Sequence, residues 1–217
     1  MRFRDRRQAG SDLADWFLEW QETPRLTDVV VLALPRGGVP VAAEIARALH
    51  APLDVLVVRK IGVPGNPELG IGALVDDDEP VFDRQALAVL GITEDELRAD
   101  VAQERRELHR RERRYRRGRP GPRLRGRTVI LVDDGLATGA TARAALRYLR
   151  RQNPRRLIMA VPVGSPDVVL SLRDDADDVV CLHQPEHFRA VGQWYADFEQ
   201  TSDAEVEHTL RAFQAPV

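Results

Sequence analysis

Short apolar runs alternate with amphipathic segments along most of this 217-residue chain. Several runs are apolar at nearly every position, which is typical of strands that helices cover on both faces of a sheet. These runs lie at residues 28–34, 54–58, 128–132, 157–161 and 179–182. The segments between them place apolar residues at helical spacing, most clearly at 40–49 and 141–151. Strands that alternate with helices predict an α/β fold with a doubly wound, mainly parallel sheet.

Three other segments have helical patterns. Residues 5–20 carry a leucine, a phenylalanine and two tryptophans at helical spacing. Thr93-Glu94-Asp95-Glu96 is a capping box, and the helix that it starts continues through an arginine-rich stretch to Gly118. Residues 203–213 form the last predicted helix. These segments are amphipathic, so we expect each to pack one face on the body of the protein.

Residues 59–73 contain closely spaced glycines and prolines. This composition predicts a long, flexible loop, and long loops in compact domains are often functional. A hairpin is expected to follow, with Asp76-Asp77-Asp78 at its tip.

Composition narrows the functional classes. A hydrophobic content of 43% suits a globular chain, and the length suggests one domain spanning 1–217. The formal net charge of −2 gives no overall attraction to nucleic acid or to a membrane surface. The first residues are charged, and no apolar stretch approaches the roughly 18 residues that a spanning helix needs. We therefore expect a cytoplasmic protein without a membrane partner.

Two single residues stand out. Cys181 is the one cysteine, and its place in an apolar run favours a buried thiol over a catalytic thiol activated by the nearby His183. Lys60 is the one lysine among 32 basic residues, the other 31 being arginines. Because an ammonium is a compact charge on a thin stem, Lys60 either performs a task that arginine would perform badly or has survived by chance.

The segment from Val129 to Thr141 carries the candidate chemistry. Its sequence is Val-Ile-Leu-Val-Asp-Asp-Gly-Leu-Ala-Thr-Gly-Ala-Thr. A buried strand here delivers Asp133 and Asp134 at its carboxyl end, which is the edge of an open α/β sheet where ligands bind. A loop of small residues then enters a helix, and its free N–H groups suit a phosphate dianion. The carboxylates suit ribose hydroxyls, or a metal held through water.

Common nucleotide-binding motifs do not describe this loop. No Gly-Lys-Ser/Thr follows it, so it is not a Walker A loop, and it lacks the Gly-x-Gly-x-x-Gly fingerprint of dinucleotide sites. It resembles instead the phosphoribosyl-pyrophosphate signature of type I phosphoribosyltransferases, in which an apolar run and two acidic residues precede Ala-Thr-Gly-x-Thr.

Two further segments resemble motifs of that family, in the family's order. Leu34-Pro35-Arg36-Gly37-Gly38 is similar to the loop that binds the diphosphate, where a non-proline cis peptide is common. Val58-Arg59-Lys60-x-Gly62 is similar to the arginine-lysine step before the flexible catalytic loop. Both segments follow predicted strands, as the resemblance requires.

The whole chain is similar to a family of predicted bacterial phosphoribosyltransferases whose base substrate is unassigned. The shared segments are residues 34–40, 59–68, 132–141 and 190–198. The resemblance implies a type I phosphoribosyltransferase fold with a small hood. Its parts would be a core at about 25–182, a flexible loop at about 59–73, an arginine-rich helix at about 93–118 and a carboxyl-terminal hood at about 183–213.

The resemblance also implies the reaction. The 5-phosphoribosyl group of phosphoribosyl pyrophosphate would pass to a nitrogenous base or related acceptor, with Mg²⁺ present and pyrophosphate released. Asp133 and Asp134 would hold the ribose hydroxyls and, indirectly, the Mg²⁺. The other substrate-binding groups would be Ala137, Thr138, Gly139, Ala140 and Thr141 for the 5′-phosphate, and Arg36, Gly37, Gly38, Arg59 and Lys60 for the pyrophosphate.

Groups for the acceptor are less well defined. The hypoxanthine-guanine branch has an aspartate that serves the base where this chain has Ala137, so Glu68 is the candidate acid or base. In this fold the segment after the last strand commonly caps the base site, so Phe188, Trp194 and Tyr195 are candidates for stacking on a planar base. The alternative is that these rings pack on the core.

The stretch from Arg105 to Arg127 is strongly basic. Glutamates four residues before arginines suit a solvated helix, which could lie at a homodimer interface. Some proteins of this fold are regulators that sense the sugar diphosphate and bind nucleic acid. That function is the alternative to catalysis, although the intact arginine-lysine step and the glycine-rich loop favour an enzyme, for which nucleic acid is not a partner.

Overall fold

The computed structural model describes residues 2–21 and 26–213. Its main sheet has five parallel strands in the order β2-β1-β6-β7-β8. The strands are β1 (Val29–Ala33), β2 (Leu53–Val55), β6 (Thr128–Val132), β7 (Arg156–Val163) and β8 (Asp178–His183). The predicted doubly wound parallel sheet is confirmed. Strand order reverses between β1 and β6, so the loops that follow these two strands meet at the ligand-binding edge of the sheet.

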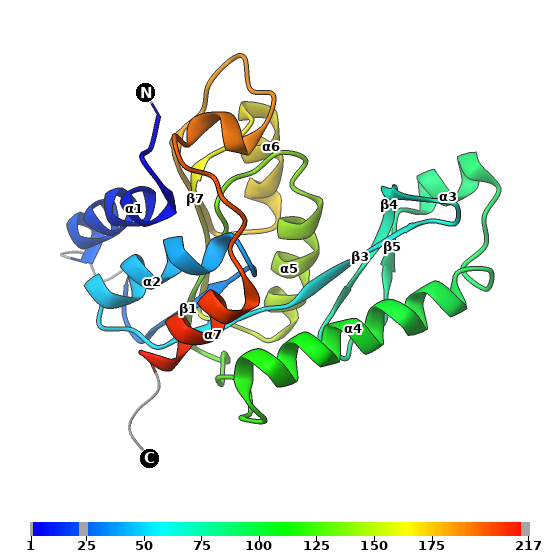
Figure 1. Ribbon diagram of the computed structural model, residues 1–217, viewed down its shortest axis with the longest axis horizontal. Helices are drawn as coiled ribbons and strands as arrows, with labels where there is room; N and C mark the ends of the chain where they lie inside the picture. The colour runs from blue at the N-terminus through cyan, green and yellow to red at the C-terminus, as the bar shows by residue number, and fades with distance from the viewer. Residues whose placement is uncertain (1, 22–25, 214–217) are drawn as a thin grey trace.

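Helices cover both faces of this sheet (Figure 1). On one side lie α1 (Arg6–Gln21), α2 (Gly38–Ala48) and α7 (Asp203–Arg211), and on the other lie α5 (Ala140–Arg151), α6 (Pro166–Ser171) and the short 3₁₀ helix η1 (Leu172–Asp174). Alternate strand residues join opposite cores: Val31 and Ile130 pack with the first group, whereas Val30 and Leu131 pack with the second. This two-sided burial is the reason that the strand segments are apolar at nearly every position.

A second layer of structure projects from the body as an arm (Figure 1). It contains the antiparallel strands β3 (Val58–Val63), β4 (Asn66–Val75) and β5 (Val81–Phe82), with α3 (Arg84–Leu90) and α4 (Arg98–Arg116). Ile71, Leu87 and Leu97 form a small core within the arm. The arm is therefore folded around apolar contacts of its own.

The prediction of a flexible loop at 59–73 was wrong, because most of these residues form the β3–β4 hairpin. Apolar side chains hidden among the glycines explain the difference, since Ile61, Ile71 and Leu74 are buried. The glycines lie where the strand register shifts, around Gly62. The predicted hairpin with Asp76-Asp77-Asp78 at its tip is confirmed between β4 and β5.

Two predicted boundaries also shift. The apolar run 54–58 is divided between β2 of the main sheet and β3 of the arm. The capping-box hydrogen bonds between Thr93 and Glu96 are present, but they close a turn, and α4 begins only at Arg98. Ile92 packs against the cluster that contains Leu97.

The carboxyl-terminal segment folds back over the body. It contains the 3₁₀ helix η2 (Val191–Trp194), and a backbone bridge pairs Tyr195 with Phe3 near the amino terminus. The amide of Phe3 donates to the carbonyl of Trp194, and the amide of Ala196 donates to the carbonyl of Phe3. Within the described ranges, no helix combines the length and the apolar character needed to cross a bilayer.

Candidate functional site

The loops after β1 and β6 are packed directly against each other. A Cβ on Gly38 would lie 2.6 Å from the carbonyl oxygen of Val132, and a Cβ on Gly37 would collide with the Asp134 carboxylate. Glycine is thus required at both positions by close approach. The peptide bond between Pro35 and Arg36 is cis, in the loop where the resemblance implied such a bond.

The loop from Ala137 to Thr141 lies at the surface for most of its length, and its amides are unpaired within the described structure. Ala137, Thr138 and Ala140 are exposed, and among the described residues no protein acceptor bonds the amides of 137–141. Gly139 has a φ of 72°, and α5 begins at the next residue. The ends of this segment, named the phosphate loop after the motif that it resembles, are fixed, since the Leu136 amide donates to the Val163 carbonyl and the Arg143 amide donates to the Gly139 carbonyl. Unpaired amides at a helix N-terminus make this loop fit an anion.

Asp133 and Asp134 form an acid pair beside this loop. The Asp134 amide donates to Asp133 Oδ1 over 2.9 Å, and Arg6 Nε donates to Asp134 Oδ2 over 2.8 Å. Burial raises the pKa of Asp133 well above its ordinary value, as does the neighbouring Asp134 charge, while Arg6 and Lys60 act in the opposite direction. Burial also raises the pKa of Asp134, against the attraction of Arg6. A buried pair of acids is costly, so a cationic ligand or donor hydroxyls would stabilise it.

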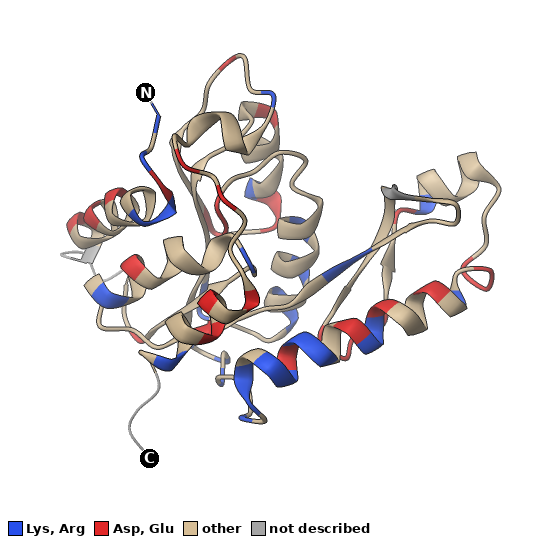
Figure 2. Cartoon of the chain, viewed as in Figure 1, with Lys and Arg blue, Asp and Glu red and all other residues tan. Residues whose placement is uncertain are grey.

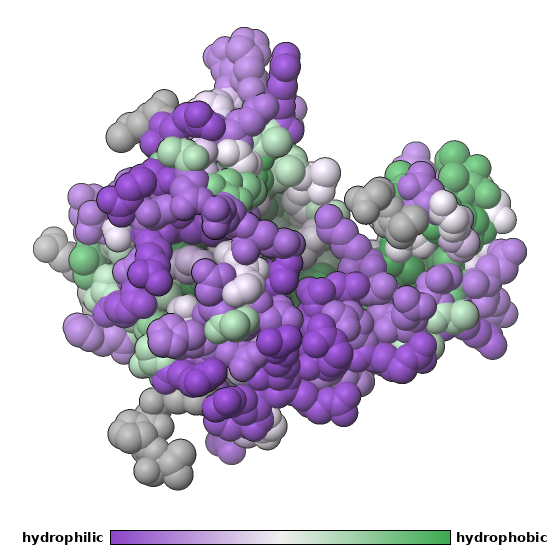
Figure 3. Space-filling model, in the orientation of Figure 1, coloured by the Kyte–Doolittle hydropathy of each residue, from purple (hydrophilic) through white to green (hydrophobic). Residues whose placement is uncertain are grey.

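Lys60 lies with the phosphate loop around one cavity. This cavity of about 740 Å³ separates the arm from α5, and it is lined by Lys60, Thr138, Ala140 and Thr141 together with Phe82 of the arm. Figure 3 shows the notch between the body and the arm on this side of the molecule. The arm thus delivers the one lysine of the chain to the loop that fits an anion.

Arg59 does not share this cavity. Its guanidinium pairs with Glu104 of α4, with Nη2 2.6 Å from Oε2. Consecutive side chains of a strand point to opposite faces, so Arg59 and Lys60 lie on opposite faces of β3. The resemblance had assigned both residues to the pyrophosphate. Arg36 reaches toward α7, where its Nη1 lies 3.7 Å from Asp203 Oδ1. Glu68 belongs to β4, but its side chain is outside the described part of the structure.

The three aromatic candidates for the acceptor pack in one hood cluster. Tyr195 is 1% exposed, its ring stacks on Phe198, and it contacts Phe3, so it offers no open face to a base. Phe188 and Trp194 are half-buried against the same cluster. Tyr195 therefore packs on the core, which was the alternative to stacking on a base, whereas Phe188 and Trp194 keep part of their surface exposed. In the described part of the chain, Trp194 Nε1 is a buried donor without a hydrogen-bond partner.

Comparison with known proteins agrees with this geometry. A family model described as "Phosphoribosyl transferase domain" matches residues 4–199. The chain belongs to this family. The crystal structure of TT1426 from Thermus thermophilus superposes with a TM-score of 0.83 at 45% identity, covering 99% of this chain and 100% of that chain. The predicted family and fold class are confirmed.

Two relatives extend beyond this phosphoribosyl transferase domain. Proteins of Mycobacterium tuberculosis strains CDC 1551 / Oshkosh and ATCC 25618 / H37Rv, both named "Putative phosphoribosyl transferase", are 48% identical over 208 residues. The matched region covers 94% of this chain but 45% of each relative. The chain therefore spans about half the length of these curated relatives.

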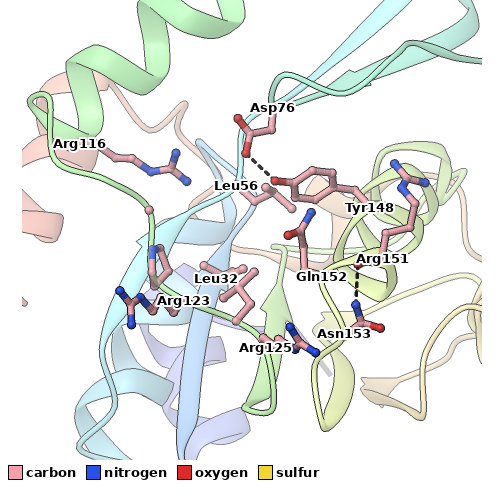
Figure 4. Close-up of a pocket in the computed structure, with 13 residues that line it drawn as sticks. Leu32, Leu56, Asp76, Arg116, Arg123, Arg125, Tyr148, Arg151, Gln152 and Asn153 are labelled. Atoms are coloured by element: carbon pink, nitrogen blue, oxygen red, sulfur yellow. Dashed lines mark hydrogen bonds between the residues drawn. The ribbon is translucent and has the colours of Figure 1, made fainter.

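A second cavity of the phosphoribosyl transferase domain lies near the carboxyl end of α5, away from the phosphate loop (Figure 4). It has a volume of about 640 Å³, and its basic lining is Arg116, Arg123, Arg125 and Arg151. The Arg116 guanidinium already donates hydrogen bonds to the Asp54 carboxylate and to the Val55 carbonyl. None of the motif residues lines this cavity, so it is separate from the candidate site.

Sequence reasoning missed Arg6 and did not expect Tyr195 to bond to the acid pair. The Tyr195 hydroxyl donates to the carbonyl of Asp134 over 2.6 Å. Arg6 stands among several arginines at the amino terminus, and its partner Asp134 is 128 residues away. No local pattern distinguishes the arginine that reaches the site from its neighbours.

Proposed function

We propose that this chain is a phosphoribosyltransferase that moves the 5-phosphoribosyl group of phosphoribosyl pyrophosphate to a nitrogenous acceptor and releases pyrophosphate. One observation carries the proposal: the unpaired amides of 137–141 lie beside the acid pair, and Thr138, Ala140 and Thr141 of the same loop share a cavity with Lys60. Phosphoribosyl pyrophosphate has the matching groups, namely a 5′-phosphate, a ribose diol and a diphosphate.

The 5′-phosphate binds at the phosphate loop in this proposal. The unpaired amides of 137–141 and the hydroxyls of Thr138 and Thr141 donate to its oxygens, and the N-terminus of α5 adds a favourable dipole. Because this phosphate does not react, its binding energy orients the ribose for the reaction.

Asp133 and Asp134 accept hydrogen bonds from the ribose hydroxyls. Each carboxylate has one oxygen bonded within the protein, Oδ1 of Asp133 and Oδ2 of Asp134, and the other oxygen has no partner among the described residues. Two free oxygens suit a diol. Displacement of pyrophosphate at C1 builds positive charge on the ribose ring, and the nearby carboxylates stabilise that charge.

The acid pair also fits Mg²⁺. Carboxylate oxygens are hard ligands, and Mg²⁺ commonly binds through one or two carboxylates, waters and substrate phosphates rather than an all-protein cage. Consistent with that mode, the described residues contain no cluster of three or more His, Cys, Asp or Glu placed to hold a metal. When bound with the substrate, Mg²⁺ would neutralise charge on the pyrophosphate leaving group.

The leaving pyrophosphate contacts two parts of the chain. The loop of Arg36, Gly37 and Gly38 lies against the acid pair, since a Cβ on Gly37 would collide with the Asp134 carboxylate. Its Arg36 and Gly37 amides are the ones offered to the pyrophosphate, because the Gly38 amide already donates to the Leu34 carbonyl. Lys60 supplies a compact positive charge from the arm, and the arm rather than a loop covers the reacting ribose to exclude water. Arg59 takes part only if its ion pair with Glu104 opens.

The acceptor lies on the hood side of the ribose. Phe188 and Trp194 flank it, each with part of its surface exposed. Glu68 is the proposed acid or base. The homodimer and the cytoplasmic location suggested by the sequence stay predictions.

Pyrophosphate release tests the proposal. The chain is mixed with phosphoribosyl pyrophosphate and Mg²⁺, and purines, pyrimidines and other nitrogen acceptors are offered singly. Turnover with at least one acceptor, abolished in Asp133→Asn, supports the enzyme. Tight substrate binding without turnover for the whole panel contradicts catalysis.

The alternative is a regulator that binds nucleic acid. Along α4 the arginines alternate with acidic residues (Figure 2), and several are paired, as Arg111 is with Glu107 and Arg114 is with Asp203. Such pairing lowers the positive field that a nucleic acid would meet. A regulator would instead show an affinity for RNA or DNA that falls steeply with salt.

A further inference from the structure

Arg6 connects three parts of the molecule that meet at the acid pair. Its Nε donates to Asp134 Oδ2 over 2.8 Å, and its Nη1 donates to the carbonyl of Glu199 over 2.8 Å. Its guanidinium also lies 3.9 Å from the centre of the Phe198 ring. The Arg6 side chain is 12% exposed and that of Asp134 is 16% exposed, so their ion pair is largely shielded from solvent.

Local structure explains how Arg6 reaches this position. Asp5 Oδ1 accepts a hydrogen bond from the Gln8 amide, a capping interaction that begins α1 at Arg6. The backbone of Phe3 forms a bridge with Tyr195 of the carboxyl-terminal segment. The start of α1 is therefore fixed on both sides, and the Arg6 side chain has a defined direction toward β6.

The contacts of Arg6 suit arginine better than lysine. A planar guanidinium can donate in two directions while its face stacks on an aromatic ring, whereas an ammonium cannot stack in that way. One side chain thereby holds Asp134, Glu199 and Phe198 in a fixed arrangement. Gly37 contributes as well, since a Cβ there would collide with Asp134 and lie 3.2 Å from Arg6 Nε.

The ion pair has a consequence for the acid pair. It occupies Oδ2 of Asp134 and leaves Oδ1 as the oxygen without a partner among the described residues. A carboxylate with both oxygens free could rotate, and a misplaced acceptor weakens binding of an oriented diol. Arg6 also places a positive charge beside two adjacent carboxylates, which reduces their mutual repulsion.

We infer that Arg6 is a positioning residue, which holds Asp134 so that one carboxylate oxygen is presented to the ribose hydroxyls of the substrate. This inference rests on the proposed function and adds a residue outside every motif of the family signature. Arg6 acts through Asp134 and does not touch the substrate itself.

A double-mutant cycle tests the inference. Calorimetric affinity for phosphoribosyl pyrophosphate with Mg²⁺ is measured for the wild type, Arg6→Gln, Asp134→Asn and the double variant. We expect each single change to weaken binding on the order of 10-fold. The affinity of the double variant should equal that of whichever single variant binds the substrate less tightly. Arg6→Lys should recover part of the loss, because it keeps the charge beside Asp134.

Arg7→Gln is the matched control. Arg7 is the next residue of α1, is exposed, and carries the same charge as Arg6. The Arg7→Gln variant should therefore bind phosphoribosyl pyrophosphate as tightly as the wild type does. If the wild type binds the substrate and the loss of affinity in the double variant equals the product of the two single losses, the inference is overturned and the proposed function stands. Wild-type protein that does not bind the substrate would overturn the proposed function as well, and melting temperatures separate either result from unfolding.

Discussion

The hydroxyl of Tyr195 donates a hydrogen bond to the backbone carbonyl of Asp134 over 2.6 Å. This bond ties the hood to the turn that carries the acid pair. Burial, the largest cause, and the adjacent Asp134 charge both raise the pKa of Tyr195, so the hydroxyl stays a donor at neutral pH. The hood therefore contributes to the geometry of the site even though the Tyr195 ring has no open face.

Tyr195→Phe should lower both stability and substrate affinity. The change leaves the Asp134 carbonyl without this donor, which costs roughly 1–3 kcal/mol in the free energy of unfolding. Affinity for the magnesium complex of phosphoribosyl pyrophosphate should fall because the Asp134 backbone is released. Tyr148→Phe is the control, since Tyr148 bonds Asp76 away from the phosphate loop. A similar loss of stability without loss of affinity in Tyr195→Phe would contradict the coupling.

Gly139→Ala should damage the phosphate loop. Its φ of 72° disfavours a side chain, and a Cβ would lie 2.5 Å from Val168 Cγ1. Gly126→Ala introduces alanine at a similar φ of 76° with open space around it, so it isolates the backbone cost of about 1 kcal/mol. We expect Gly139→Ala to melt lower than Gly126→Ala and to bind inorganic phosphate or substrate more weakly. Equal affinities in the two variants would argue against a phosphate site here.

The place of Lys60 in the site can be tested with a reagent that modifies amines and does not react with arginine. It is the one lysine of the chain and is exposed, so an amine-selective reagent should modify Lys60 and otherwise only the α-amino group. Substrate with Mg²⁺ should slow modification of Lys60 several-fold, because a bound anion would cover the ammonium. Peptide mass spectrometry measures both sites, and the α-amino group is the internal control. Unchanged modification of Lys60 at saturating substrate would place it outside the site.

The main sheet and the candidate site were predictable because their signals are local. Runs such as Val129–Val132 are apolar at every position, which marks a strand buried on both faces. The acid pair and the phosphate loop follow one such strand within a few residues. The carboxyl edge of a parallel sheet then brings the loops after β1 and β6 together.

The arm and the Arg6 contact were not predictable because their causes are distant in sequence. Glycines and prolines at 59–73 indicate a loop, yet Ile71 packs with Leu87 of α3 and with Leu97 at the start of α4, which lie later in the chain. Likewise, Arg6 acquires its role from Asp134 and Phe198, which lie far along the chain. Tertiary packing overrides local composition in both cases.

Asp203 should make stability depend on pH. Its carboxylate accepts from the Tyr115 hydroxyl and pairs with Arg114, and these contacts lower the pKa of Asp203 below the ordinary carboxyl range. The ionised form therefore stabilises the fold above the unfolded-state pKa of about 4, and this stability is lost as pH falls through the lower folded-state pKa. Asp203→Asn should destabilise the protein by roughly 1–3 kcal/mol at pH 7, with the deficit shrinking below about pH 4.

Glu112→Gln provides a control of opposite sign. Burial raises the pKa of Glu112, so its contribution to stability is greatest below the unfolded-state value and is lost as pH rises through the folded-state value. Thermal melting of both variants and the wild type from pH 7 to pH 3 separates the two effects. A deficit in Asp203→Asn that stays constant over this range would contradict the ionic account.

Calorimetric titration of phosphoribosyl pyrophosphate with Mg²⁺ into the wild type and the Asp133→Ala/Asp134→Ala variant tests the central claim most directly. The account predicts a clear binding heat for the wild type and an affinity loss on the order of 100-fold or more in the double variant, because several charge-assisted hydrogen bonds disappear. Retained secondary structure by circular dichroism would show that the variant is folded. Equal affinities for two folded proteins would contradict the assignment of the acid pair to the ribose.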